Sequence, residues 1–169
     1  EGPKNVAQTA EIADGWLPLY YSPFRQDVYA DQLAGAKDDF QVAALAMFGV
    51  TDDDDPETIE NALAGTRAML AFYIGGMGAK GQNYHTKLAA RMGLGEQAER
   101  IQDLFLEGRG DEAVFEVPVE FADEISLVGT PARIADRVAA WKESPVTEIL
   151  VHAADRATLE QAADIILSP

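Results

Sequence analysis

The sequence predicts an α/β protein whose strands run parallel. Short apolar runs of strand length alternate with segments in which apolar residues recur every three or four positions, as in amphipathic helices. Residues 40–50 are almost continuously apolar, which is typical of a strand buried on both faces of a parallel sheet. A further strand is expected at 147–152, and another in the apolar run 16–21, where Pro18 predicts that the strand is short. Three strands in 169 residues are too few for a closed barrel, so we expect the chain to form part of a larger unit.

The composition limits the kinds of partner and ligand that we expect. The net charge of −16 disfavours nucleic acid and anionic membranes, because binding phosphate groups needs clustered Lys and Arg. The chain has no Cys, and its two histidines, His85 and His152, lie far apart, so no metal site is expected. The longest apolar run is too short to cross a bilayer. These features predict a soluble cytoplasmic protein.

The opening stretch is the first candidate site. Gly2 permits close approach of a ligand to the backbone, and Pro3 suits the first position of a helix. Apolar residues then recur on one helical face up to Ala13, and Gly15 is the predicted helix stop. The unpaired amides and positive dipole of such a helix start attract anions. An ordinary loop-to-helix entry remains the alternative interpretation.

Four consecutive aspartates at 52–55 favour a helix start over a metal site, because the ligand spacing of a calcium loop is absent. Asp55 is expected to be the N-cap and Pro56 the first residue of a helix that continues over 57–73. Further helices are expected at 26–37, 86–92 and 95–107, and residues 111–123 are expected to hold a short helix, a break at Pro118 and another helical turn. Two more helices are expected after Thr130-Pro131 and after Asp155, the last with Leu159, Ala162, Ala163 and Ile166 facing inward.

The glycine-rich stretch at 74–85 matches neither a dinucleotide fingerprint nor a phosphate-binding GxxxxGK[ST] loop. Two interpretations stay open for it. It is either a plain connector between helices or a lid over a pocket.

Three stretches taken together resemble a known family. They are residues 2–18, 73–81 and 127–151, the last combining Gly129-Thr130-Pro131 with a final strand. In this order and spacing they are similar to the C-terminal half of a luciferase-like monooxygenase, in the subgroup that uses the deazaflavin coenzyme F420.

The resemblance implies part of a (β/α)8 TIM barrel. Residues 1–169 would form a single luciferase-like domain, truncated at its N-terminus, with about strands six to eight and helices five to eight. Residues 57–124 would be a helical insertion after strand seven.

The resemblance also implies an oxidoreductase that transfers hydride between F420 and a small organic substrate. One alternative is an FMN-dependent monooxygenase of the same class. Another is a non-catalytic half barrel that serves as a binding or assembly module, pairing its exposed sheet edges in a homodimer.

The family's acid and base residues are expected in the half of the barrel that this sequence does not include, so no catalytic residue is assigned. By resemblance, the cofactor phosphate would be held by Gly2, Pro3, Lys4 and Asn5. The expected substrate pocket draws on side chains near the strand ends and the glycine-rich stretch: Tyr20, Tyr21, Lys80, Asn83, His85 and His152.

Overall fold

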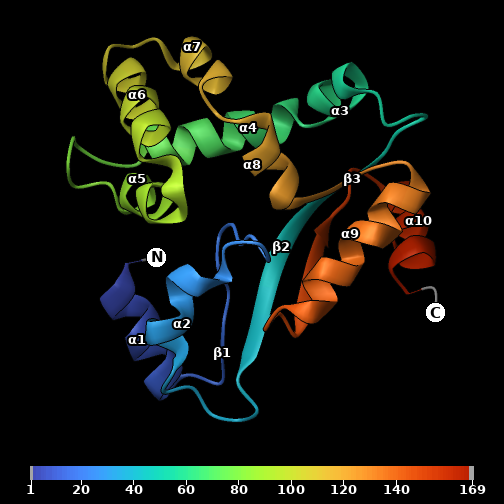
Figure 1. Cartoon of the computed structure of the whole chain (residues 1–169), viewed down its shortest axis with the longest axis horizontal. Helices are drawn as coiled ribbons and strands as arrows, with labels where there is room; N and C mark the ends of the chain where they lie inside the picture. The colour runs from blue at the N-terminus through green and yellow to red at the C-terminus, as the bar shows by residue number, and fades with distance from the viewer. Residues whose placement is uncertain (1, 168–169) are drawn as a thin grey trace.

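A parallel sheet forms the centre of the computed structural model, which describes residues 2–167 (Figure 1). Strand β2 (Gln41–Val50) pairs with each of the other strands that the described residues contain. These are β1 (Gly15–Trp16), β3 (Ser126–Gly129) and β4 (Glu148–His152), and every pairing is parallel. The chain therefore has the α/β fold with a parallel sheet that the alternation of strand and helix patterns predicts.

The two faces of the sheet differ in burial. Side chains at even positions of β2 from 42 to 48 are buried, Ala44 and Ala46 completely, whereas those at odd positions from 43 to 49 are half-buried. Leu45 on this second face is opposite Leu150 of β4, which is 38% exposed. The expectation that 40–50 is buried on both faces is thus wrong for the Leu45 face, which the described residues cover only in part.

Helices surround the sheet on several sides (Figure 1). α1 (Pro3–Ile12) and α2 (Ala30–Leu33) lie beside β1, and α9 (Pro131–Glu143) and α10 (Arg156–Ile166) lie on the opposite side. The segment between β2 and β3 forms a separate group above the sheet, which we call the helical layer: α3 (Pro56–Ala62), α4 (Ala64–Ala71), α5 (Tyr84–Ala89), α6 (Gly95–Leu106), α7 (Gly110–Phe115) and α8 (Val119–Glu124). None of the described helices is long and apolar enough to cross a membrane.

Local capping explains where several helices begin. Thr130 and Asp155 each accept a hydrogen bond from a backbone amide in the first turn of α9 and α10, as their sequence positions predict. Asp55 occupies the N-cap position of α3 without a side-chain cap bond. Its neighbour Asp54 instead accepts hydrogen bonds from the amide and the hydroxyl of Thr130, at 2.8 and 2.7 Å. These bonds hold the pKa of the Asp54 carboxyl below its usual value and join the start of the helical layer to α9.

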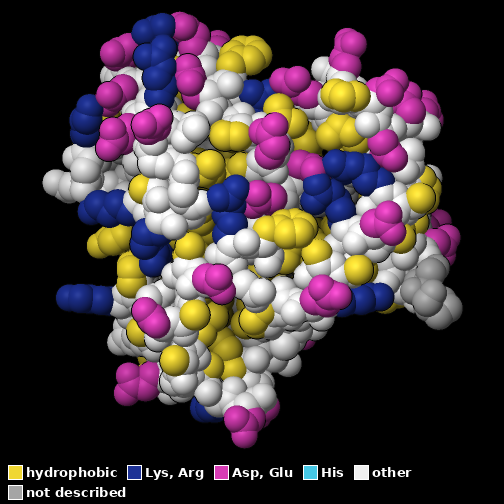
Figure 2. Space-filling view, in the orientation of Figure 1, with side chains coloured by type: hydrophobic (Ala, Val, Ile, Leu, Met, Phe, Trp, Pro, Cys, Tyr) yellow, Lys and Arg dark blue, Asp and Glu magenta, His cyan; other side chains and the backbone are white. Residues whose placement is uncertain are grey.

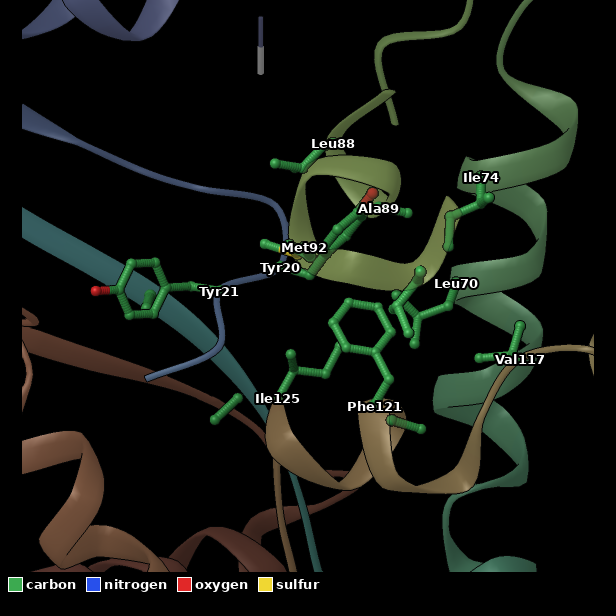
Figure 3. Packing of buried hydrophobic residues seen from close by; sticks show 14 of the residues in the cluster. Tyr20, Tyr21, Leu70, Ile74, Leu88, Ala89, Met92, Val117, Phe121 and Ile125 are labelled. Carbon is green, nitrogen blue, oxygen red and sulfur yellow. The ribbon is translucent and has the colours of Figure 1, made fainter. Parts of the chain in front are cut away.

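Aromatic packing ties the segment after β1 to the helical layer. Figure 3 shows Tyr20 among side chains of that layer, and its ring meets the Phe121 ring edge to face at 6.2 Å. Tyr21 points the other way, toward the sheet, where it stacks on Tyr29 at 5.9 Å. Edge-to-face and offset ring pairs add to the energy of apolar burial. Consecutive tyrosines therefore contribute to two different parts of one core.

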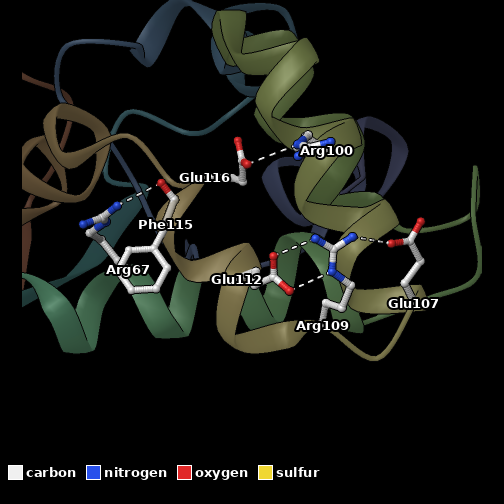
Figure 4. A network of polar contacts seen from close by, with 7 residues as sticks. All are labelled: Arg67, Arg100, Glu107, Arg109, Glu112, Phe115 and Glu116. Carbon is white, nitrogen blue, oxygen red and sulfur yellow. Dashed lines mark hydrogen bonds and ion pairs between the residues drawn. The ribbon is translucent and has the colours of Figure 1, made fainter.

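Buried arginine bonds hold the helical layer together (Figure 4). Arg67 of α4 is 7% exposed and donates to the carbonyls of Phe115 and Val117 at 3.1 and 3.0 Å. These carbonyls lie at and just beyond the end of α7, where helical partners are lacking. On the surface, Arg109 makes a two-pronged bond with Glu112. The buried contacts matter more for stability, because exposed ion pairs are screened by water.

The strand predicted to be short in the run 16–21 is limited to Gly15–Trp16, because Pro18 follows and cannot donate a ladder hydrogen bond. Two other secondary-structure predictions are wrong. Residues 126–129, where no strand was predicted, form the strand β3, which pairs with Met47–Val50. The predicted helix at 26–37 is only a 3-10 turn at Gln26–Tyr29 and one turn of α2.

Two predicted side-chain and backbone roles also change. Leu159 and Ala163 of α10 are exposed, Leu159 by 52%, whereas Ala162 is buried as expected. Gly15 does not end α1, whose C-cap is Ala13. It instead permits close strand pairing, since a Cβ there would lie 2.8 Å from the carbonyl oxygen of Gln41.

Candidate functional site

A surface cavity of about 790 Å³ opens at the start of α1. It is lined by the predicted phosphate loop, Gly2 to Asn5, together with Gln8 and Tyr84. The first turn of α1 closes on the carbonyl of Gly2, which accepts from the amides of Asn5 and Val6 at 2.9 and 3.1 Å. The predicted loop therefore does border a cavity, at the positive end of a ten-residue helix.

The ring of Tyr84 covers Gly2. A Cβ on Gly2 would lie 3.1 Å from two ring carbons of Tyr84, closer than most such contacts. The absence of a side chain at Gly2 therefore allows the start of α1 and the start of α5 to lie close together. The cavity is formed by two segments that are about eighty residues apart in the sequence.

Asn83 fixes the position of Tyr84. Its side chain is 1% exposed, and its amide nitrogen donates to the carbonyls of Tyr73 and Ile74 at 2.9 and 2.8 Å. Its amide oxygen accepts from the backbone of His85 at 2.8 Å, which caps α5. Three bonds thus hold the residue just before Tyr84, so the ring is placed by a buried, hydrogen-bonded anchor.

Two lysines lie beside this cavity, and the part of the chain that the structure describes gives neither a carboxylate partner. Among the described residues, neither Lys4 nor Lys87 forms an ion pair, although the protein carries 29 acidic residues. Lys4 lines the cavity, and the ammonium of Lys87 stands 5.8 Å from the centre of the Tyr84 ring. In Figure 2, Lys and Arg side chains gather on the side of the molecule where Figure 1 places α1 and α5. This side is suited to an anionic ligand.

Two of the predicted substrate residues come together near the cavity. The ring of His85 lies 5.9 Å from that of Tyr20 and 5.1 Å from that of Tyr73. The hydroxyl of Tyr20 donates to the backbone carbonyl of His85 at 3.4 Å. The segment after β1 and the start of α5 are therefore in direct contact.

The other predicted substrate residues do not join them. Tyr21 lies in the core beside the sheet, where burial raises the pKa of its phenol to about 12. Lys80 is paired with Asp103, and with Asn83 it lines a different cavity. His152 is exposed at the carboxyl end of β4. The predicted set is thus divided among four places.

Sequence reasoning missed Tyr84 and Lys87. The usable signal was Asn83, a typical N-cap residue, since a cap there makes Tyr84 the first residue of a helix and places Lys87 one turn further on.

Among the described residues there is no group of three or more His, Asp or Glu side chains arranged to hold a metal ion.

The comparison with family models assigns the chain to a class. Residues 1–148 match the model of the luciferase-like monooxygenases. The chain belongs to this family.

Individual relatives are consistent with this assignment. A protein of Mycobacterium tuberculosis (strain H37Rv) named as a coenzyme F420-dependent oxidoreductase is 38% identical over 98% of this chain. The phthiodiolone/phenolphthiodiolone dimycocerosates ketoreductase of Mycobacterium kansasii is 22% identical over 89% of it. The chain covers 48% and 42% of these two relatives, so it spans about half the length of the curated proteins that it matches.

A solved structure supports the fold. The coenzyme F420-dependent tetrahydromethanopterin reductase of Methanopyrus kandleri superposes with a TM-score of 0.63 and 22% identity. The superposition covers 98% of this chain and 48% of that one. The polypeptide therefore has the architecture of half of that enzyme.

Proposed function

We propose that this chain is the cofactor-phosphate-binding half of an F420-dependent oxidoreductase, which transfers hydride between the deazaflavin and a small organic substrate. The family membership and the names of its relatives support this proposal. The observation that carries it is the cavity at the start of α1, where a glycine-proline helix entry and an aromatic wall meet a lysine that has no ion-pair partner within residues 2–167.

The residues at this cavity fit the phosphate end of such a cofactor. Gly2 leaves the space that a side chain would fill between α1 and the Tyr84 ring. The α1 dipole and the ammonium of Lys4 both favour a negative charge there. The deazaflavin, when bound, supplies the hydride chemistry, and this chain's residues anchor and orient it.

Two histidines remain candidates for the substrate pocket in this proposal. His85 is half-buried between the rings of Tyr20 and Tyr73, close to the start of α5. His152 is exposed at the carboxyl end of β4, the end of a parallel sheet at which α/β proteins bind ligands. Tyr21 and Asn83 are assigned to the core and to the α5 cap instead.

We infer further that the sheet belongs to a (β/α)8 barrel. The half-buried Leu45 face of β2 and the exposed Leu150 support this inference, since the interior of a closed barrel fills such a face with side chains from other strands. Residues 57–124 are then a helical insertion between two barrel strands.

Titration of the purified chain with oxidised F420, followed by the cofactor's fluorescence, tests the proposal. We expect saturable binding that weakens about 3- to 10-fold in Lys4→Gln. The variant loses one positive charge near the phosphate, and because water partly screens that charge the effect is modest. Lys142→Gln removes another exposed lysine that does not line the cavity and should leave binding unchanged. Absence of saturable F420 binding would contradict the proposal, and tighter binding of FMN would favour the monooxygenase alternative.

A further inference from the structure

The ring of Tyr84 is not held at the α1 cavity by the helix cap alone. Asn83 fixes the backbone at the start of α5 through three hydrogen bonds, but these bonds do not touch the Tyr84 side chain. The ring is 61% exposed and meets Gly2 of α1. An exposed side chain samples several rotamers unless further contacts favour one of them. The position of this wall of the cavity therefore depends on what else contacts the ring.

Lys87 makes such a contact from one turn further along α5. Its ammonium stands 5.8 Å from the centre of the Tyr84 ring, a distance at which a cation is attracted to the face of an aromatic ring. Residues three positions apart on a helix are neighbours, and helical side chains lean toward the N-terminus of their helix. The spacing of the two residues in the sequence therefore agrees with the contact that the structure shows.

Lys87 has a possible carboxylate partner that it does not use. Lys87 and Glu99 both line a second cavity, of about 310 Å³, between α5 and α6. Lys80 lines the same cavity and is paired with Asp103. Within residues 2–167, by contrast, no ion pair joins Lys87 to Glu99 or to any other carboxylate. The ammonium of Lys87 lies against the Tyr84 ring instead, so its charge favours the ring position observed.

We propose that Lys87 is a positioning residue for the α1 cavity, whose charge holds the Tyr84 ring over Gly2 and so keeps the aromatic wall of the site in place. Lys4 has a different role, because it lines the cavity and can act on a ligand directly. Lys87 acts through the ring. The effect on the ring follows from the geometry of this chain, whereas the effect on ligand affinity rests on the proposed function.

NMR spectra of the full chain without ligand test the position of the ring. A ring held over Gly2 displaces the Gly2 signals by its ring current, and Tyr84→Leu defines those signals without a ring. Lys87→Met keeps an apolar stem and removes the charge. We expect it to lower the ratio of covering to open ring positions about 2- to 5-fold, which moves the Gly2 signals toward those of Tyr84→Leu. Lys87→Arg keeps a cation and should leave them in place, as should the control Lys142→Met, at an exposed lysine that does not line the cavity.

A double-mutant cycle with F420 separates positioning of the ring from a direct effect of charge on the ligand. Lys87→Met should weaken F420 binding about 2- to 5-fold in the natural sequence. In the Tyr84→Leu background the same substitution should change the affinity less than about 1.5-fold, because Lys87 then has no ring to position. The proposal is overturned if Lys87→Met leaves the Gly2 signals unmoved, or if it weakens binding equally in both backgrounds. If no variant binds F420, the proposed function fails, and the Gly2 signals still decide whether Lys87 positions the ring.

Discussion

Asn83→Ala removes the side chain that holds Tyr84 over Gly2. The expected loss in the free energy of unfolding follows from the three hydrogen bonds that this side chain makes. Loss of an N-cap side chain costs about 1 kcal/mol. The carbonyl of Tyr73 loses a buried donor, at about 1–2 kcal/mol. The carbonyl of Ile74 loses less, because the Thr86 hydroxyl still donates to it at 2.6 Å. The free energy of unfolding should therefore fall by about 2–3 kcal/mol.

Urea denaturation followed by circular dichroism measures this change. The control is Asn61→Ala, at an exposed residue inside α3 whose side chain forms no hydrogen bond within residues 2–167, and it should change stability by less than about 0.5 kcal/mol. Asn83→Ser keeps a capping oxygen and should recover about 1 kcal/mol of the loss. If Asn83→Ala is no more destabilising than the control, the anchoring role of Asn83 is refuted.

Three other predictions concern the rest of the fold. Glu124→Gln should lower the free energy of unfolding by about 2 kcal/mol in urea denaturation, because Arg25 then loses its two-pronged, largely buried partner. Gly129→Ala should lower Tm by several degrees in a thermal melt, since φ is +137° and the new Cβ would lie 2.9 Å from the Asp54 carboxylate. Burial raises the pKa of Tyr21 to about 12, so the neutral phenol is favoured in the folded state. The stabilisation that comes from this buried neutral phenol is complete below pH 10 and is lost as the pH rises from 10 to 12. In Tyr21→Phe, this part of the loss of stability at alkaline pH should be absent. Unchanged stability in Glu124→Gln or Gly129→Ala would contradict the role given to that residue. An unchanged dependence of stability on alkaline pH in Tyr21→Phe would contradict the role of the buried phenol.

Features set by a few neighbouring residues were predictable from the sequence. The caps at Thr130 and Asp155 lie where they were expected, because capping depends on residues within one turn. The Gly2–Asn5 loop lines a cavity, and its role in binding a ligand stays a prediction.

Features that depend on distant residues were not predictable. The four residues of β3 are a strand only because Met47–Val50 of β2 offers them a partner. Tyr84 reaches the cavity because buried bonds from Asn83 orient α5, and no local pattern shows where that helix points. Tyr20 and Tyr21 look equivalent in sequence, yet they pack in different parts of the core.

The central claim is that the start of α1 and the ring of Tyr84 together bind the phosphate end of F420. The most direct test is to record backbone amide NMR spectra of the chain during titration with oxidised F420. We predict saturable shifts grouped at residues 2–8 and at Tyr84, the segments that line the cavity. Saturable binding whose shifts leave these residues unaffected would contradict the claim.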